Sequence, residues 1–406
     1  MKREGLGGAV LTMVLMAGAL GPAARGAGFG IYEGSARGDA LGGTLVGRAD
    51  DASAIYYNPA GITQLPGDQF MVGATLIAPK TDVRTLTPQG WVTTSTKDNN
   101  WLPPHVYATH QINDSLWLGA GLFSRFGLGT EFDPNWPGRY NSFTADIQSL
   151  TLNPDIAVKL TDQLSLAVGV NATWFDIKLE RKIPGTPGPD HILTLKGDDT
   201  AFGYNVGVRY APNDWLALGA SYLGKVRENV KGDADLGGAQ TDASSHVELP
   251  DEFSFGIAVK PAPKVTVEVG ATYTGWSSFD QLDLKFANPQ VLGPQVVIPK
   301  NWSNVWRYQA GVEYAATKAL TLRAGYVYDE EPIPQETADY LVPANDRQLF
   351  SLGCGYRWTR WMLDVSYAYL MIKDRHITAR PMDGVLESDY SNGCAHMVGV
   401  SVSTKI

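Results

Sequence analysis

The chain has little cysteine, histidine or charge for its length. Only 2 of its 406 residues are cysteine, 6 are histidine, and charged residues make up 18%. Two cysteines are too few for a disulfide framework, and no Cys-x-x-Cys pair or histidine-rich metal spacing occurs. We place Cys354 and Cys394 on strands that are not neighbours, and both a bridge and two free thiols stay open. The sequence predicts no metal site and no cofactor.

Long apolar runs are also absent. From residue 27 onward, no stretch of about 18 apolar residues is free of charge, glycine and proline, which excludes membrane-spanning helices. No nucleophile elbow, phosphate-binding loop or metal constellation is found, so we predict that the protein is not an enzyme. The net charge of -9 argues against a nucleic-acid partner. A secreted soluble protein and a membrane β-barrel remain.

The amino terminus has the pattern of an export signal. Lys2 and Arg3 precede an apolar or small run from residue 6 to residue 20. This run is too short to cross a bilayer comfortably but has the length of a secretory signal. A cut after Gly26 would leave small residues at the positions that signal peptidase reads. We therefore predict a signal peptide over residues 1–26 and a mature protein that begins at Ala27.

The feature that decides the fold is a repeated alternation of apolar with small or polar residues. Period two is the signature of a strand with two different faces. Between residues 164 and 171, one face carries Leu164, Leu166, Val168 and Val170, and the other carries Ser165, Ala167, Gly169 and Asn171. The pattern recurs in five further segments: 115–126, 215–225, 265–275, 320–328 and 361–371.

The connections between these segments alternate in length. Six are tight turns, at 113–114, 161–162, 212–214, 261–263, 316–318 and 359–360. Seven are longer and polar, at 86–100, 127–143, 184–195, 229–246, 277–303, 329–345 and 373–393. Short turns on one side and long extracellular loops on the other are typical of outer-membrane barrels. We predict an all-β fold, a transmembrane antiparallel β-barrel of about fourteen strands over residues 67–406.

Aromatic residues are abundant, with 11 Trp and 18 Tyr alongside 44 Gly. Several tryptophans fall near the ends of the expected strands, where the aromatic girdles of a membrane barrel lie. A soluble sandwich or a β-solenoid also alternates but gives no reason for this placement. The tryptophans assigned to the girdles are Trp101, Trp117, Trp174, Trp215, Trp276, Trp306, Trp358 and Trp361.

Residues 27–66 lack the strand pattern. They lead through Asp50-Asp51 to Asn58-Pro59-Ala60 without a charge run or low-complexity sequence. Such a segment is either an exposed periplasmic tail or a plug inside the barrel. The absence of low complexity favours the plug, here called the hatch.

These residues resemble the FadL-like long-chain fatty acid transporters of Gram-negative outer membranes, a family that includes aromatic-hydrocarbon members. The resemblance covers most of the mature chain. It rests on short motifs in a fixed order: Ala27-Gly28-Phe29, Asp50-Asp51-Ala52, Asn58-Pro59-Ala60, Phe126-Gly127-Leu128-Gly129-Thr130-Glu131-Phe132, Trp306-Arg307-Tyr308, Gly311-Val312-Glu313-Tyr314, Leu322-Arg323-Ala324-Gly325-Tyr326 and Asn345-Asp346-Arg347.

The resemblance implies a fourteen-stranded barrel plugged by the hatch. It also implies that a hydrophobic ligand is captured by extracellular loops and leaves sideways at a kink in the third strand. We expect that kink at Phe126-Gly127, braced from inside by Asn58-Pro59-Ala60. The resemblance implies that Phe29 meets the ligand and that Arg181 binds an acid headgroup. Arg307 is a second candidate cation, expected from the residues alone.

Other interpretations of these residues stay open. The glycines near Gly127 could simply begin a long loop, and Arg181 and Arg307 could pair with Glu180 and Glu313. A neutral aromatic hydrocarbon is the alternative ligand. A polar-solute porin is opposed by the hatch, and a barrel phospholipase would need a Ser and His pair that no strand spacing suggests. The expected partners are the hydrophobic ligand and outer-membrane lipid, and the expected assembly is a monomer.

Overall fold

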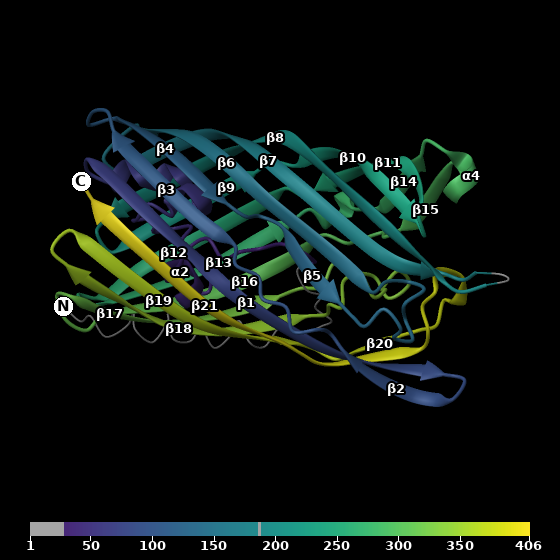
Figure 1. Ribbon diagram of the computed structural model, residues 1–406. Coiled ribbons are helices and arrows are strands. Elements are labelled where there is room, and N and C mark those ends of the chain that lie inside the picture. The colour runs from purple at the N-terminus through teal and green to yellow at the C-terminus, as the bar shows by residue number, and fades with distance from the viewer. Residues whose placement is uncertain (1–27, 186–187) are drawn as a thin grey trace.

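The protein is an elongated β-barrel in its computed structural model, which describes residues 28–185 and 188–406 (Figure 1). The predicted signal peptide, residues 1–26, lies outside the described residues. No helix among the described residues has the length and apolar character needed to cross a bilayer.

The strands, in chain order, are β1 (Asp68–Thr87), β2 (Gly90–Ser95), β3 (Pro104–Gln111), β4 (Leu116–Phe123), β5 (Gly127–Glu131), β6 (Thr144–Lys159), β7 (Leu164–Ile183), β8 (His191–Asn213), β9 (Leu216–Leu223), β10 (Val226–Leu236), β11 (Ala239–Leu249), β12 (Glu252–Ala262), β13 (Val265–Thr274), β14 (Gln281–Phe286), β15 (Gln295–Pro299), β16 (Val305–Ala315), β17 (Leu320–Asp329), β18 (Arg347–Trp358), β19 (Trp361–Ile372), β20 (Arg375–Ile377) and β21 (Ser388–Lys405). The helices are α2 (Ala36–Ala40), α3 (Ala54–Tyr57), η1 (Pro59–Gln64), η2 (Trp276–Ser278), α4 (Pro289–Leu292) and η3 (Pro381–Asp383).

The barrel closes because β1 pairs with β3 on one edge and with β21 on the other. All pairs are antiparallel, and several wall strands consist of two segments separated by a short break. Counted this way, the wall has fourteen strands, as predicted. Their order around the barrel is β1, β3, β4 with β5, β6, β7, β8, β9 with β10, β12 with β11, β13 with β14, β16 with β15, β17, β18, β19 and β21.

The two faces of β7 confirm the alternation read from the sequence. Val168 and Val170 are more than half exposed on the outer surface. Ala167 and Asn171, on the other face, are buried toward the lumen. The apolar set therefore faces lipid, and the small or polar set faces the hatch.

The end that carries the carboxyl terminus also carries the short turns, and the longer hairpins project from the opposite end (Figure 1). Several of the predicted longer connections contain strands: β2 lies in 86–100, β5 in 127–143, and β14 and β15 in 277–303. The segment 229–246 is mostly the β10–β11 hairpin, paired from Val226–Leu249 to Leu236–Ala239. This hairpin carries charged residues because it extends beyond the apolar band, and charge there resembles the composition of a loop.

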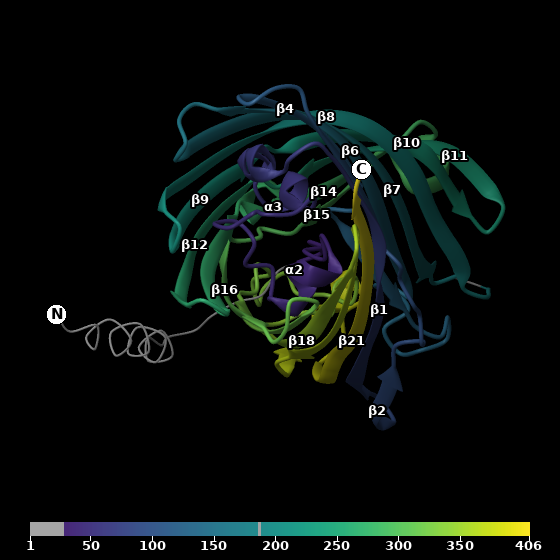
Figure 2. The same cartoon turned by 90° about the vertical axis from the view of Figure 1, so that its left-hand side faces the viewer.

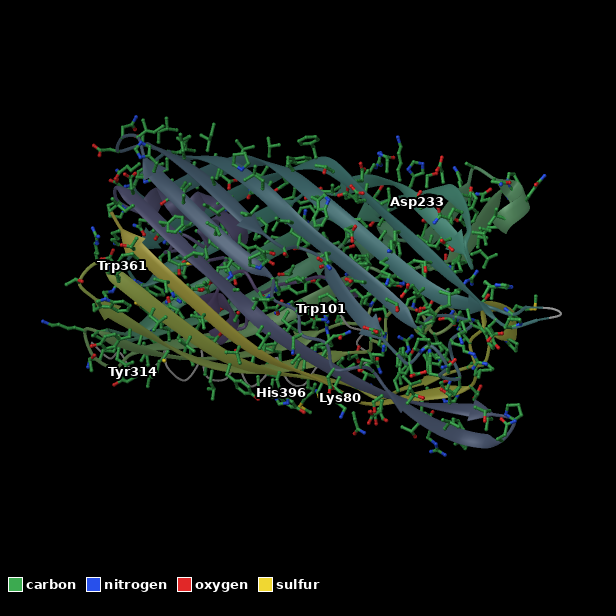
Figure 3. All side chains as sticks on the ribbon, in the orientation of Figure 1. Lys80, Trp101, Asp233, Tyr314, Trp361 and His396 are labelled. Carbon is green, nitrogen blue, oxygen red and sulfur yellow. The ribbon has the colours of Figure 1, made fainter. Side chains whose placement is uncertain are left out.

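The girdle assignment was correct for some tryptophans and wrong for others. Trp174, Trp215 and Trp358 are exposed on the outer surface, where Tyr314 and Trp361 also lie (Figure 3). Trp117 and Trp276 are buried inside. A position near a strand end fixes the height of a residue along the barrel, but the parity of the strand decides which face it takes. Trp117 has inward parity on β4 and donates from Nε1 to the carbonyl of Leu65 at 2.8 Å. Trp276 lies in η2 and Trp101 in the connection before β3, so strand parity does not apply to them.

Residues 28–66 fold inside the barrel. Helices α2 and α3 lie within the ring of strands (Figure 2). Helix α2 contacts β17, β18, β19 and β21, whereas η1 contacts β4, β6, β7 and β8. The hatch therefore touches both sides of the lumen.

The two cysteines are free. Cys354 lies on β18 and Cys394 on β21, and β19 pairs with both strands and separates them. The expectation that they lie on non-neighbouring strands is confirmed, and of the two open alternatives the structure has the free thiols.

Candidate ligand pathway through the barrel wall

The third wall strand is interrupted at residues 124–126. Segment β4 ends at Phe123, opposite Thr151 of β6, and β5 begins at Gly127, opposite Gln148. Between these two pairs the third strand has three residues and β6 has two. One extra residue on one strand is the defining feature of a β-bulge. We call residues 124–126 the break; it lies where the kink was expected.

Among the described residues, the ladder between β3 and β5 is not continued beyond the break, although the Lys97 amide donates to the carbonyl of Glu131, at the end of β5, at 2.7 Å. Strand β3 begins at Pro104, directly after Pro103. Proline has no backbone N–H, so neither residue can continue the ladder toward β5. Segment β5 consequently has β6 as its paired strand, and its other edge has only single backbone hydrogen bonds, from Gly127 to Phe29 and from Lys97 to Glu131, in the described part of the chain. A gap in the ladder lies between β1 and β5.

Backbone groups at the break have partners outside the wall ladder, whereas the buried Arg125 guanidinium has no hydrogen-bond partner among the described residues. The Ser149 hydroxyl accepts a hydrogen bond from the Phe126 amide at 2.9 Å and donates to the Phe126 carbonyl at 2.8 Å. The amide of Ile31 donates to the carbonyl of Arg125 at 2.8 Å, and the Gly127 amide donates to the carbonyl of Phe29 at 3.0 Å. Residues 29–31, called the strap, therefore pair with the break as a short strand.

Gly127 leaves room for the Ile31 side chain. A Cβ atom on Gly127 would lie 2.5 Å from Cδ1 of Ile31. A larger residue there would require the end of the Ile31 side chain to shift. Gly127 follows the break directly as the first residue of β5.

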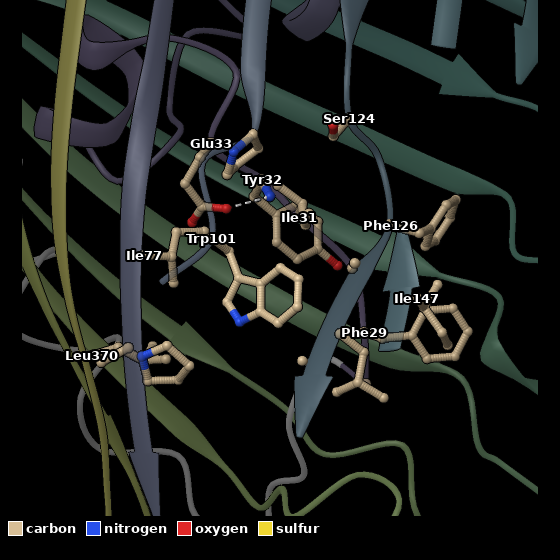
Figure 4. Close-up of a pocket in the computed structure, with 18 of the residues that line it drawn as sticks. Phe29, Ile31, Tyr32, Glu33, Ile77, Trp101, Ser124, Phe126, Ile147 and Leu370 are labelled. Carbon is tan, nitrogen blue, oxygen red and sulfur yellow. Dashed lines mark hydrogen bonds between the residues drawn. The ribbon is translucent and has the colours of Figure 1, made fainter. Parts of the chain in front are cut away.

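A cavity of about 420 Å³ lies behind the break (Figure 4). Its surface is mostly apolar, and its volume is within the range typical of small-molecule sites. It reaches the outer surface at Lys80 and Leu102, of which Leu102 is 63% exposed. We call it the wall cavity; its lining includes Phe29, Ile31, Tyr32, Ile77, Trp101, Phe126, Gly127, Leu128, Ile147, Arg307, Val327, Leu349, Leu370 and Met397.

Phe29 lies at the inner end of the wall cavity in a cluster of aromatic rings. Its ring centroid is 4.7 Å from Trp276, 5.6 Å from Trp302, 5.8 Å from Phe279 and 5.9 Å from Phe126. Most of these contacts are edge-to-face, the favourable geometry for aromatic pairs. The first described residues of the chain are thus held by rings from the wall.

Arg307 supplies a buried positive charge to the cavity lining. It is 6% exposed, and its guanidinium lies 4.0 Å from the ring centroid of Tyr32. In the described part of the chain it has no carboxylate within 4.0 Å, whereas Arg347 in the same lining pairs with Asp329 at 3.0 Å. The expected alternative, a pair with Glu313, is not formed. A buried cation stacked on a ring but lacking a carboxylate can accept one from a ligand.

Arg181 lies away from the wall cavity, near the extracellular end of β7. By parity it shares the inner face of Ile177 and Leu179. Glu180 pairs with Lys178 at 3.0 Å and not with Arg181. The structure therefore separates the two candidate cations instead of bringing them together.

Two smaller apolar pockets extend from the wall cavity toward the extracellular hairpins. The middle pocket, about 40 Å³, shares Phe29, Leu128, Ile147 and Val342 with the wall cavity. The outer pocket, about 30 Å³, lies under the β10–β11 hairpin. The two smaller pockets share Ile177, Leu179, Val247 and Leu282. An apolar surface thus runs from the hairpins to the break.

Asn58-Pro59-Ala60 lies elsewhere than expected. The Asn58 side chain donates to the carbonyls of Val46 and Val208, both at 2.9 Å, and its Oδ1 accepts from the Ala60 amide at 3.2 Å. A Cβ atom at Gly207 would lie 2.5 Å from Oδ1 of Asn58, so this glycine lets the motif reach β8. The motif braces the hatch against β8, and the strap takes the position at the break.

A network of charges fixes the other side of the hatch. Glu313 on β16 accepts from Arg48 at 2.8 Å, from Arg37 at 3.2 Å and from Arg323 of β17 at 2.7 Å. Arg37 also pairs with Asp50 at 2.7 Å. Burial raises the pKa of Asp50, but the guanidinium groups of Arg37 and Arg48 outweigh it and lower the pKa to about 2.

Three residues of this site, Ser149, Ile31 and Trp101, were not predicted from the sequence. Ser149 and Ile31 gave no local signal, because their roles depend on pairing between segments far apart in the chain. Trp101 was assigned to the aromatic girdle, but it lines the wall cavity. The Pro103-Pro104 pair that follows it was a usable signal, since two successive residues without amide donors cannot continue an internal strand.

A closed barrel with an internal hatch and an apolar cavity in its wall defines a class of outer-membrane transport proteins. Residues 18–405 match the model of the family described as "Outer membrane protein transport protein (OMPP1/FadL/TodX)". The chain belongs to this family. It is accordingly a protein of the Gram-negative outer membrane and a transport protein, not an enzyme.

Relatives and solved structures agree with this assignment. The chain is 28% identical over 393 residues to the long-chain fatty acid transport protein of Escherichia coli O6:H1, covering 85% of this chain and 86% of the relative. It is 28% identical over 398 residues to a 47 kDa outer membrane protein of Pasteurella multocida, covering 88% and 91%.

Among solved structures, a FadL homologue from Pseudomonas aeruginosa superimposes with a TM-score of 0.81 at 23% identity, covering 93% of this chain and 99% of that one. The toluene transporter TodX of P. putida gives 0.72 at 19% identity, with coverage of 91% and 97%. These likenesses show the fold.

Proposed function

We propose that the protein takes up hydrophobic small molecules through the outer membrane, with long-chain fatty acids as its ligand class. The observation that carries this proposal is the wall cavity, which is mostly apolar, reaches the outer surface beside the break and is lined by Arg307, a cation with no carboxylate within 4.0 Å in the described part of the chain. Ligand is caught by the extracellular hairpins at the outer pocket, follows the apolar surface inward and leaves sideways into the bilayer. The monomer suffices for this, because each barrel encloses its own cavity.

Sideways release follows from the solvation of an acyl chain. A tail passing through a water-filled lumen would gain no apolar surroundings. Transfer into bilayer hydrocarbon is favourable by about 0.8 kcal/mol per buried CH₂ group. The route needs an opening in the ladder, and the break with its proline-terminated neighbour strand supplies one.

The two arginines take successive roles in this proposal. Arg181, on the inner face beyond Leu179, attracts the carboxylate at the outer pocket. Arg307 then binds the carboxylate inside the wall cavity, where the surroundings are poorer in water and a charge-assisted pair is stronger.

The hatch gates this passage in two ways. Phe29 occupies the space between the middle pocket and the wall cavity, so an acyl chain must displace it. The strap then leaves Phe126 and Gly127, whose backbone it pairs with. Asn58, Pro59 and Ala60 keep the remainder of the hatch on β8 during this movement.

Uptake of a neutral aromatic hydrocarbon is the second candidate. The rings of Phe29, Trp276, Phe279 and Trp302 form a cluster in which a planar aromatic ligand could replace the Phe29 ring. Relatives of the same fold include the toluene transporter named above. A neutral hydrocarbon forms no ion pair with Arg307, so the effect of removing this charge distinguishes the two candidate ligand classes.

The test measures radiolabelled oleate and toluene uptake by cells that lack their own transporter. They express wild type, Arg307→Gln or Arg347→Gln at matched surface levels. Arg307→Gln should reduce oleate uptake about tenfold, a barrier change of about 1.4 kcal/mol, and leave toluene uptake unchanged. Arg347→Gln is the matched control, because Arg347 lines the same cavity but is already paired with Asp329.

Equal loss of both ligands in Arg307→Gln would show that the residue supports the fold and does not bind a headgroup. Toluene uptake without oleate uptake by wild type would contradict the fatty acid assignment and favour the hydrocarbon.

A further inference from the structure

We infer that the Trp101 side chain closes the wall cavity toward the outer surface and limits the width of the ligands that pass through the wall. This inference rests on the proposed sideways route, and it assigns a selectivity role to one side chain of this chain. The residue belongs to the connection between β2 and β3, which crosses the gap between β1 and β5.

The backbone of Trp101 is fixed to β1. Its amide donates to the carbonyl of Ile77 at 2.9 Å, and the Ile77 amide donates to the carbonyl of Trp101 at 2.8 Å. This pair replaces the missing strand at one point of the gap. Pro103 and Pro104 follow after Leu102 and restrict the backbone further. The position of the Trp101 Cα atom is therefore well defined.

The indole ring fills the remaining width of the gap. It packs on Gly129 of β5, where a Cβ atom would overlap the ring. Figure 4 shows the ring beside Ile77, and Trp101 is one of the residues that line the wall cavity. The connection before β3 is also bonded to β5 at its outer end, where the Lys97 amide donates to the Glu131 carbonyl at 2.7 Å, and the indole fills the space next to Gly129.

The ring has no hydrogen bond to lose when it moves. Its Nε1 atom is buried and has no hydrogen-bond partner in the described parts of the chain. The two hydrogen bonds of the residue belong to its backbone, which stays on β1 when the side chain rotates. A large ring on a fixed backbone, held by packing alone, has the properties of a gate.

Leu102, the next residue, shows that the Trp101 ring lies between the cavity and the outer surface. Leu102 is 63% exposed and forms part of the same lining, so the ring separates the enclosed part of the cavity from the outer surface. A linear acyl chain needs only a small displacement of the ring. A ligand with a wide rigid group needs the whole indole to leave the gap.

The experiment compares two acids of different width, radiolabelled palmitate and a fatty acid carrying a terminal pyrene. Uptake is measured in cells lacking their own transporter for wild type, Trp101→Ala, Trp101→Phe and Trp91→Ala. Trp91 is the matched control, because it is an exposed tryptophan of β2, stacked under Arg84, and does not line the cavity. A heat-modifiability gel confirms that each barrel is folded.

We expect Trp101→Ala to raise the initial uptake rate of the pyrene acid about tenfold, which corresponds to a barrier lower by about 1.4 kcal/mol. Palmitate uptake should change less than about twofold, Trp101→Phe should lie between, and Trp91→Ala should match wild type. Trp101→Phe also covers the case in which the alanine variant does not fold.

An unchanged ratio of the two rates in Trp101→Ala and Trp101→Phe would overturn the inference, and so would equal stimulation of both acids. Failure of the proposed function has a different signature, namely no palmitate uptake by folded wild type. That result would overturn both claims.

Discussion

The two parts of the hatch are held in different ways. The part from α2 to η1 is attached to the wall by buried ion pairs and by side-chain hydrogen bonds on both sides of the lumen. The strap, residues 29–31, is attached by two backbone hydrogen bonds to the break and by the ring contacts of Phe29. Breaking the ion pairs of the part from α2 to η1 leaves charged groups without partners. Moving the strap away from the break frees only backbone amide and carbonyl groups and apolar side chains, which water or a ligand can contact.

This difference explains how a plug can be stable and still allow passage. A buried charge that loses its partner raises the free energy by several kcal/mol, so any other position of the part from α2 to η1, the anchored part, is strongly unfavourable. Backbone hydrogen bonds contribute about 1 kcal/mol each, and apolar contacts can be exchanged for contacts with an acyl chain. The strap is therefore the part of the hatch that a hydrophobic ligand can displace.

Glu313→Gln should have the largest effect on the anchored part. Glu313 accepts from Arg37, Arg48 and Arg323, and removing its charge leaves three guanidinium groups undercompensated. We expect a loss of about 3 kcal/mol in unfolding free energy. Denaturant titration monitored by the heat-modifiability shift measures it.

The control for Glu313 is an exposed ion pair. Arg227 pairs with Glu248 at 2.8 Å on the β10–β11 hairpin, with its side chain 80% exposed. Arg227→Gln should cost less than about 1 kcal/mol, because an exposed pair gains little over its hydration. Equal effects of the two substitutions would remove the distinction between anchored and exposed charges.

Asn58→Ala should have an intermediate effect. It leaves the carbonyls of Val46 and Val208 without the side-chain donor that bridges hatch and wall. The expected cost is about 1 to 3 kcal/mol, the range for buried groups left unsatisfied. Faster protease cleavage within residues 36–66 of folded barrels would report it. Unchanged cleavage would mean that the motif does not hold the hatch.

The smallest effect should be a dependence on pH at Asp50. Its folded pKa of about 2 lies below the usual value of about 3.9. The stabilisation is therefore complete above pH of about 4 and is lost as the pH falls through about 2. Hydrogen exchange of the hatch should quicken over this interval in wild type. Asp50→Asn should lack that step; an identical step in the variant would assign it to another group.

The barrel could be predicted from the sequence because the alternation of apolar with small or polar residues directly reflects the two environments of each strand. Each strand face meets either lipid or the lumen, so residues such as Val168 and Ala167 carry the information locally. The position of the break was also available, since Gly127 and its neighbours resemble a known pattern.

The contacts of the site could not be predicted in the same way. The partner of Ile31 is Arg125, and that of Glu313 is Arg48, each far away in sequence. No local pattern specifies which segment of a plug meets which strand. This is why Asn58-Pro59-Ala60 was expected at the break, although its contacts are with β8.

The measurement that tests this account most directly locks the strap to the break. Gly30 and Phe126 face each other between the two flanking hydrogen bonds, which makes them a non-hydrogen-bonded pair. Their Cα atoms should be about 4.5 Å apart, within the range for a disulfide. Gly30→Cys and Phe126→Cys are combined in a chain whose Cys354 and Cys394 are serine, and oleate uptake is measured before and after reduction.

The account predicts that the oxidised protein takes up no more oleate than cells without a transporter, and that a reducing agent restores uptake. The variant with Phe126→Cys alone, in the same background, should take up oleate at the same rate before and after reduction. Undiminished uptake by protein with a fully formed disulfide would contradict the account, because the strap would then stay in place during transport.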